Sequence, residues 1–342
     1  MTENQYIVEL EGLLRRLPLE ERQDIVQDIR EYFVEGREDG KTDDEITASL
    51  GFPSTIATEL LSSYPESTEV VGTSTGSEVI HIQESDYKSI SIDVQHGALI
   101  LSPSIKDMTT VELTGSNEKL HLSAEVQGDL LVVKLKSLRP RFMMFSFSMK
   151  AVVLKVSIPK KLYEAITLKT NNGRIYAEKL LCQALRVDSD NGRIQLREIA
   201  TRLLETKTDN GIIEVTNTQS DRISAKSDNG RIEMRHVEGD EIAVKTDNGR
   251  IELSHVNGNI VGETDNGRIT LLTGSLDRNI DMHTDNGSIL IQSETKPTNV
   301  SIHVKTDHGR VDVFGEKNSR TDFGSCEHKI RLKSDNGRIT VQ

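Results

Sequence analysis

The chain has 342 residues, of which 35% are hydrophobic and 28% charged, a composition typical of a folded protein that buries a core. Aromatic residues make up only 4% and tryptophan is absent, so the core must consist of aliphatic side chains, which favours repetitive β-structure. The formal net charge of −12 argues against nucleic acid as a partner, because phosphate binding requires an excess of Lys and Arg.

The two cysteines, Cys182 and Cys326, lie far apart in sequence and match no metal-binding or redox spacing. We therefore expect both to be reduced, as in a cytosolic protein, with no disulfide framework. The N-terminus, MTENQYIVELEGLLRRL, carries charges where a signal peptide requires an apolar stretch, and no run approaches about 18 apolar residues. These features predict a cytoplasmic protein, with a peripheral membrane location as the alternative.

Residues 1–64 carry the pattern of a helical module. Apolar residues recur at spacings of three and four, Pro18 and Pro53 suit helix starts, and Thr42 with Glu45 forms a capping-box pattern. The segment contains 6 Lys and Arg against 15 Asp and Glu, which gives a net charge of −9. We predict an α-helical signalling or interaction module over 1–64, followed by a flexible linker rich in Ser, Thr and Gly over 65–77.

A repeat with the core Thr/Ser-Asp-Asn-Gly-Arg-Ile dominates the rest of the chain. Its glycine recurs nine times, at spacings of 19, 19, 19, 19, 18, 20, 22 and 28 residues. Apolar residues stand seven and five positions before the glycine and two and four after it, a pattern of strand, corner and strand. The Asn-Gly pair predicts a tight corner with positive φ. The predicted structural turn ladder consists of Asn172, Gly173, Asn191, Gly192, Asn210, Gly211, Asn229, Gly230, Asn248, Gly249, Asn266, Gly267, Asn286, Gly287, Gly309, Asn336 and Gly337.

Two architectures fit this unit: an array of antiparallel hairpins, or a solenoid in which each repeat makes one coil. The near-constant spacing favours the solenoid, with coils stacked in register about 4.8 Å apart. The predicted fold is therefore mainly β, a single-stranded β-solenoid (β-helix) of about 19-residue coils preceded by a small all-α module. We expect irregular coils over 78–160, regular coils over 161–342 and no separate C-terminal cap, while the role of the excursion between residues 309 and 337 stays open.

Stacked coils align equivalent positions into columns. The asparagines would form a ladder along one edge, and the Asp column beside them would be flanked by columns of Arg and Lys that offset its charge. Stacked carboxylates also suit Ca²⁺, but the glycine-rich motif of calcium-binding β-rolls is missing, which favours a structural ladder. His236 and His255 occupy the same column in neighbouring coils and are expected to stack at the surface, with a two-His metal site as the weaker alternative.

No catalytic, cofactor-binding or metal-binding residue is predicted. The sequence contains no Walker A, dinucleotide-binding or HExxH motif. Residues 72–76 match the G-x-S-x-G pattern, but they lie in the predicted linker and not in the strand-to-helix elbow that such a nucleophile needs. The chain is therefore predicted to be non-enzymatic.

The segment RPRFMMFSFSMK, residues 139–150, concentrates 3 of the 7 Phe and 3 of the 7 Met. It either covers the irregular coils or is exposed as an apolar, basic-flanked patch suited to an anionic membrane surface or a partner protein. The candidate interaction residues are Phe142, Met143, Met144, Phe145 and Phe147.

Two family resemblances follow from these residues. The segment LPLEERQDIVQDIREYFVEGREDGKTDDEITASLGFPSTIATEL resembles the helix-turn-helix-associated α-helical signalling domain of bacteria. That resemblance implies a signalling adaptor whose partners are PadR-like regulators or membrane stress proteins. The Asp-Asn-Gly-Arg-Ile coils look like the bacterial putative-adhesin β-solenoid family.

These features together predict a cytosolic, non-enzymatic scaffold or adaptor in envelope-stress or transcriptional signalling, which binds protein partners through the helical module and the solenoid. A self-assembling structural polymer is one alternative, because solenoid ends expose unpaired strand edges. A surface adhesin is the other.

Overall fold

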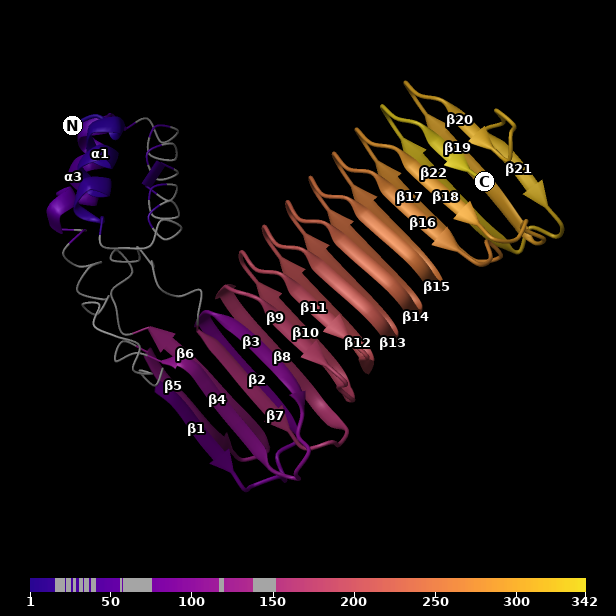
Figure 1. The fold of residues 1–342 in the computed structure, drawn as a ribbon. Helices are drawn as coiled ribbons and strands as arrows, with labels where there is room; N and C mark the ends of the chain where they lie inside the picture. Colours follow the sequence, from indigo (N-terminus) through magenta and orange to yellow (C-terminus); the bar gives the residue numbers. More distant parts are fainter. Residues whose placement is uncertain are drawn as a thin grey trace. The chain divides into compact units, whose positions relative to one another are not determined.

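The chain divides near residue 73 into a helical unit and a β unit. The computed structural model describes residues 1–15, 22, 26, 29–30, 33, 37, 41–55, 57, 76–116, 120–137 and 152–342 (Figure 1).

The helical unit contains α1 (Glu3–Leu13) and α3 (Asp43–Leu50). Each begins with a capping box, in which the side chain of Thr2 or Thr42 accepts a hydrogen bond from the backbone N–H three residues later. The capping box expected from the sequence at Thr42 is thus confirmed. Residues 22, 26, 29–30, 33 and 37 are also helical. The described core of this unit consists of Tyr6, Ile7, Leu10, Leu14, Val26, Ile29, Phe33, Ile46, Leu50 and Ala57.

The β unit is a solenoid of stacked coils, as predicted. Equivalent residues of successive coils pair in parallel, as in the series Ile194, Ile213, Ile232 and Ile251, which excludes an array of antiparallel hairpins. Strands that precede the corners form one face of the stack and strands that follow them form the other (Figure 1). Because the two faces enclose a single aliphatic core that runs the length of the stack, each coil is stabilised mainly by its neighbours.

The strands of the first face are β2 (Ser89–His96), β6 (Leu130–Ser137), β8 (Tyr163–Asn172), β10 (Cys182–Ser189), β12 (Ala200–Thr208), β17 (Ile280–Thr284), β19 (Val300–Thr306) and β22 (His328–Ser334). Those of the second face are β3 (Ala98–Pro103), β7 (Val153–Ile158), β9 (Ile175–Glu178), β11 (Ile194–Arg197), β16 (Ile269–Thr273), β18 (Ile289–Ser293), β20 (Val311–Val313) and β23 (Ile339–Val341). Three central strands run from the second face into the first: β13 (Ile213–Ser227), β14 (Ile232–Thr246) and β15 (Ile251–Thr264).

The coils do not stack in sequence order at the C-terminal end. Strands β22 and β23, which flank Gly337, lie between the coil of Gly287 and the coil of Gly309. The outermost coil is further covered by β21 (Arg320–Phe323), which pairs antiparallel with β19. The expectation of no separate cap is therefore wrong, and the excursion between residues 309 and 337 supplies the capping strand.

The N-terminal end is arranged in a similar way. The coil of β6 and β7 lies outside the coil of β2 and β3, although it follows that coil in sequence. Antiparallel strands cover it on both faces, namely β1 (Gly76–Ile82) with β4 (Thr109–Ser116) and, on the other face, β5 (Leu120–Gln127). Both ends of the stack thus depart from the parallel register of the coils. This departure disfavours pairing of the end strands with another chain.

Close backbone approach, and not positive φ, explains the corner glycines. None of the nine described repeat glycines has φ in the positive region, so that expectation is wrong. A Cβ added at Gly230 would instead lie 1.5 Å from the carbonyl oxygen of Gly211 in the preceding coil, and the other corners give 1.6–1.9 Å. Only glycine allows the coils to stack at this distance.

In the coils from Thr208 onward, the Thr or Ser three positions before the glycine links successive corners, whereas the buried hydroxyls of Thr170 and Ser189 have no hydrogen-bond partner among the described residues. The hydroxyl of Thr208, which is fully buried, donates to the carbonyl of Gly192 at 3.3 Å and accepts from the N–H of Gly211 at 3.1 Å. The equivalent hydroxyl of Thr246 connects Gly230 and Gly249 in the same way. This column therefore satisfies buried backbone groups that the tight corner would otherwise leave unpaired.

Substitution of Gly230 by Ala tests this account of the corner. We expect Gly230→Ala to lower the free energy of unfolding by about 3 kcal/mol or more, because the new Cβ meets backbone on the neighbouring coil that cannot rotate away. Gly274→Ala is the matched control, since the nearest atom to its Cβ is Oε2 of Glu294 at 3.9 Å. Equal denaturant midpoints for the two variants would contradict the explanation.

Candidate interaction surfaces

The asparagines at the corners form a continuous hydrogen-bonded ladder. Each side-chain amide donates from Nδ2 to Oδ1 of the asparagine in the preceding coil, over distances of 2.7–3.0 Å. In stacking order the ladder consists of Asn172, Asn191, Asn210, Asn229, Asn248, Asn266, Asn286 and Asn336. These amides bind one another, so the corner edge is occupied by structural contacts.

A histidine replaces asparagine at both ends of this ladder. His96 lies beside Asn172 in the coil of Gly97, and His308 precedes Gly309 in the outermost coil. Partial burial lowers the pKa of His96 below its ordinary value. Histidine thus replaces the corner asparagine in those parts of the stack where the spatial order of the coils differs from their order in the sequence.

The charged columns beside the ladder pair differently from the expectation. Lysines four positions before the glycine lie near the Asp column, as in Lys207 and Asp209 at 3.3 Å, and this hydrogen bond raises the pKa of Lys207. Two Arg residues that follow the glycine pair instead with Glu. Nη2 of Arg231 is 3.3 Å from Glu233, and Nε of Arg193 is 3.9 Å from Glu214 in the next coil. The exposed pairs, such as Lys207 with Asp209, contribute little individually to stability.

Positive φ occurs at the opposite edge of the coil, where the sequence offered no glycine to indicate it. The residues there are Lys179, Glu198, Asn217, His236 and His255, with φ of 51–54°. The rings of His236 and His255 are stacked with centroids 5.0 Å apart and an interplanar angle of 22°, as expected from their common column.

The two histidines line a shallow groove of about 600 Å³. Nε2 of His255 lies 3.3 Å from Oε1 of Glu294. Among the described residues no group of three or more His, Cys, Asp or Glu side chains is arranged to hold a metal ion.

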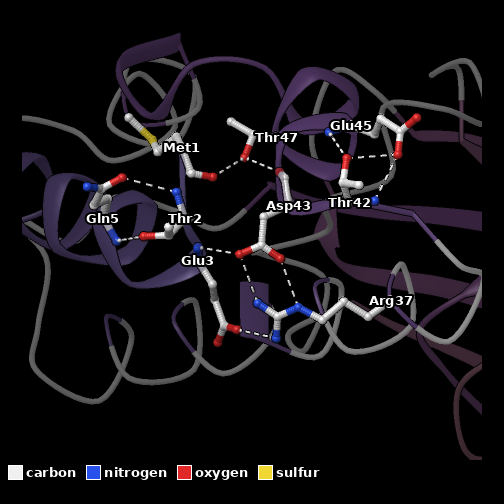
Figure 2. A network of polar contacts seen from close by, with 9 residues as sticks. All are labelled: Met1, Thr2, Glu3, Gln5, Arg37, Thr42, Asp43, Glu45 and Thr47. Atoms are coloured by element: carbon white, nitrogen blue, oxygen red, sulfur yellow. Dashed lines mark hydrogen bonds and ion pairs between the residues drawn. The ribbon is translucent and has the colours of Figure 1, made fainter.

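Figure 2 shows the polar network that joins the two described helices of the N-terminal unit. The guanidinium of Arg37 donates to Asp43 at 2.9 and 3.1 Å and pairs with Glu3 at 2.8 Å. Asp43 also accepts from the N–H of Glu3 at 3.2 Å, and the N-terminal amine pairs with Asp44. The hydrogen bond from Arg37 holds the pKa of Asp43 below its ordinary range.

The outer surface of the helical unit carries isolated apolar side chains. Val8 on α1 is 69% exposed and Phe52 after α3 is 75% exposed.

The predicted interaction residues Phe142, Met143, Met144, Phe145 and Phe147 lie outside the described residues. Their place in the topology follows from the strands on either side. The segment connects β6 to β7, where the repeating coils have a four-residue corner. No helix among the described residues is long and apolar enough to cross a membrane.

A stack of parallel coils whose corner columns are filled by structural contacts defines a β-solenoid scaffold. Residues 87–342 match the family described as Toastrack DUF4097, and the chain belongs to this family. Residues 5–59 match the family described as HAAS. No curated protein matches the chain.

Solved structures that resemble the chain include three bacterial proteins. A Parabacteroides distasonis protein called a putative adhesin is 15% identical, with a TM-score of 0.52 over 78% of this chain and 98% of its own. A second protein of that species, called a putative lipid binding protein, is 16% identical, with a TM-score of 0.47 over 79% and 98%. A Bacteroides fragilis putative adhesin is 15% identical, with a TM-score of 0.44 over 79% and 98%. These are names of adhesion or binding proteins, and the first likeness shows the fold.

Removal of one rung from the amide ladder should weaken the stack in proportion to the hydrogen bonds lost. Asn229→Ala removes one donated and one accepted bond, both of 2.8 Å, and should cost about 2 kcal/mol in unfolding free energy. Asn172→Ala removes only the 2.9 Å bond from Asn191 and should cost about 1 kcal/mol. Chemical denaturation measures both, and a larger loss for Asn172→Ala would contradict the ladder.

Acidification should weaken the hydrogen bonds and ion pairs of Asp43. Because the folded pKa of Asp43 is lowered, its stabilising contribution is complete above the unfolded value of about 3.9 and is lost as the pH falls through the folded pKa. Asp43→Asn should therefore speed amide hydrogen exchange in α1 at neutral pH and leave it unchanged in strong acid. Glu11→Gln, at an exposed position of α1, is the control. An equal effect of Asp43→Asn at both pH values would show that the ion pair is not the cause.

Proposed function

We propose that this protein is a non-enzymatic adaptor that acts by binding. Its helical module binds a protein partner, and its solenoid is a rigid scaffold. The observation that supports this most directly is the combination in one chain of a HAAS-type module and a Toastrack solenoid. The side chains of the described corner columns contact neighbouring coils. We therefore assign partner binding to the helical module and to the irregular parts of the stack.

The partner of the module is proposed to be a protein, such as a PadR-like regulator or a membrane stress protein. The net charge of −9 over residues 1–64 opposes contact with nucleic acid. Exposed Val8 and Phe52 give the module apolar contacts that suit a protein surface. A cytoplasmic location, with peripheral membrane contact, belongs to the same proposal.

The segment 139–150 is proposed as a second contact of the adaptor. It replaces a four-residue corner of the coil formed by β6 and β7, and its Phe and Met side chains are flanked by Arg139, Arg141 and Lys150. An apolar segment with basic neighbours suits a partner protein or an anionic membrane surface.

A surface adhesin is the second candidate function, supported by the name of the P. distasonis structure with the same fold. A self-assembling polymer is less favoured, because end-to-end growth requires parallel coil edges. Antiparallel β21, β4 and β5 cover the outer coils instead.

The adaptor proposal is tested by a cross-linked pull-down from bacterial lysate with the full-length chain as bait. We expect recovery of a regulator or membrane protein that is lost when residues 1–64 are removed. A triple variant, Phe142→Ser, Phe145→Ser and Phe147→Ser, should lose membrane or partner association while its thermal unfolding stays unchanged.

Other outcomes would overturn the adaptor proposal. Recovery of the bait alone, with or without residues 1–64, would favour self-assembly, which sedimentation at rising concentration would reveal as unlimited growth. Digestion of the protein by protease added to intact cells would favour the adhesin.

A further inference from the structure

A basic groove of about 670 Å³ lies on the first face of the solenoid at its C-terminal end. It crosses β22, β19 and the capping strand β21, the orange to yellow end of the stack in Figure 1. The groove has no acidic residue in its lining, although the whole chain carries a net charge of −12. Its charged or titratable lining residues are His303, Lys305, Arg320, Lys329, Arg331 and Lys333.

The arrangement places like charges opposite one another. Lys333 on β22 is the direct neighbour of Lys305 on β19. His303 lies between Arg331 on one side and Arg320 on the other. Like charges at directly opposed positions of adjacent strands are unfavourable.

The central coils of the same face also place lysines opposite one another, since Lys226 is the direct neighbour of both Lys207 and Lys245. Acidic side chains lie on the same strands, however, so Arg186 pairs with Glu205 at 2.6 Å and Arg222 pairs with Glu241 at 2.9 Å. Lys245 likewise faces Glu263 at 3.1 Å. The C-terminal groove differs from the central coils in that no acidic residue belongs to its lining.

Four cations of the groove have carboxylate partners at its border. Arg331 lies 3.6 Å from Asp281, and Arg320 lies 3.0 Å from Asp322. Lys333 lies 3.0 Å from Asp335, and Lys305 lies 3.9 Å from Asp307. The cationic side chains of these pairs are 44–70% exposed, so water screens the pairs and an external carboxylate can replace the partner at small cost.

The spacing of the cations indicates the shape of the ligand. Lys329, Arg331 and Lys333 occupy alternate positions of one strand, so their side chains leave the same face about 6.8 Å apart. An extended peptide with acidic residues at every second position has the same repeat. The guanidinium of Arg331 offers two parallel donors to a carboxylate, which a single lysine does not.

We propose that this groove binds an extended, acidic segment of a partner protein, laid along β22 with alternate Asp or Glu side chains on the cations of β22 and β19. The proposal rests on the proposed adaptor function and adds the partner chemistry that the solenoid recognises. An anionic membrane fits the groove less well, because the alternate spacing of the cations on β22 matches the repeat of an extended peptide.

Fluorescence anisotropy of a labelled peptide of alternating Glu and Ser tests the groove with the full-length protein. We expect binding that weakens as salt rises, and about tenfold weaker binding for the double variant Lys329→Gln with Arg331→Gln. The matched control is Lys207→Gln with Lys226→Gln, which removes two lysines from the central coils of the same face. A peptide of alternating Gln and Ser should not bind.

If the double variant Lys329→Gln with Arg331→Gln lowers the stability of the protein, a second double variant, Lys305→Gln with Arg320→Gln, tests the groove instead. Absence of peptide binding at low salt, or equal losses in the groove and control variants, would overturn the proposal. Preferred binding of pyrophosphate or of phosphatidylserine vesicles would overturn it as well. The pull-down that depends on residues 1–64 is independent of these results, so failure of the groove and failure of the adaptor function are distinguishable.

Discussion

The solenoid depends on the approach of each corner backbone to the corner of the preceding coil. A Cβ at Gly230 would lie 1.5 Å from the carbonyl oxygen of Gly211, which means that the strand spacing of about 4.8 Å is kept through the turn as well as along the strands. This close contact also brings equivalent side chains of the repeat within hydrogen-bonding distance. The Thr or Ser hydroxyl inside the corner binds the glycine carbonyl, and the asparagine outside it binds the next asparagine.

This constraint also shapes where the protein can bind something. In the described repeat, Gly, Asn and the inner hydroxyl are committed to neighbouring coils, and the charged columns largely pair with one another. Side chains that are available to bind another molecule therefore lie where the repeat is interrupted. The helical module, the long connection between β6 and β7, and the basic groove at the C-terminal end are such places. The regular coils thus hold the irregular features of the solenoid at fixed positions.

The order of the coils is the feature that sequence reasoning missed. Residues 328–342 repeat the motif as faithfully as the central coils, so nothing local distinguishes an outer coil from an inner one. The structure places this coil between those of Gly287 and Gly309, because the excursion between residues 309 and 337 is long enough for the chain to return and add β21 at the edge. Only pairing across the whole stack decides between these positions. The positive φ at His236 and His255 was missed for a related reason, since no glycine marks that edge.

The sequence alone determined the coil, its length, its buried positions, its in-register stacking and the separation of a helical module from the β unit. Those features are periodic, and a periodic pattern reports directly on local backbone geometry and on contacts between identical positions. Tertiary structure decided the coil order, the capping strands and the juxtaposition of Asp281 with Arg331, which lie 50 residues apart in sequence. These depend on which non-equivalent segments meet, and that is a property of the complete stack.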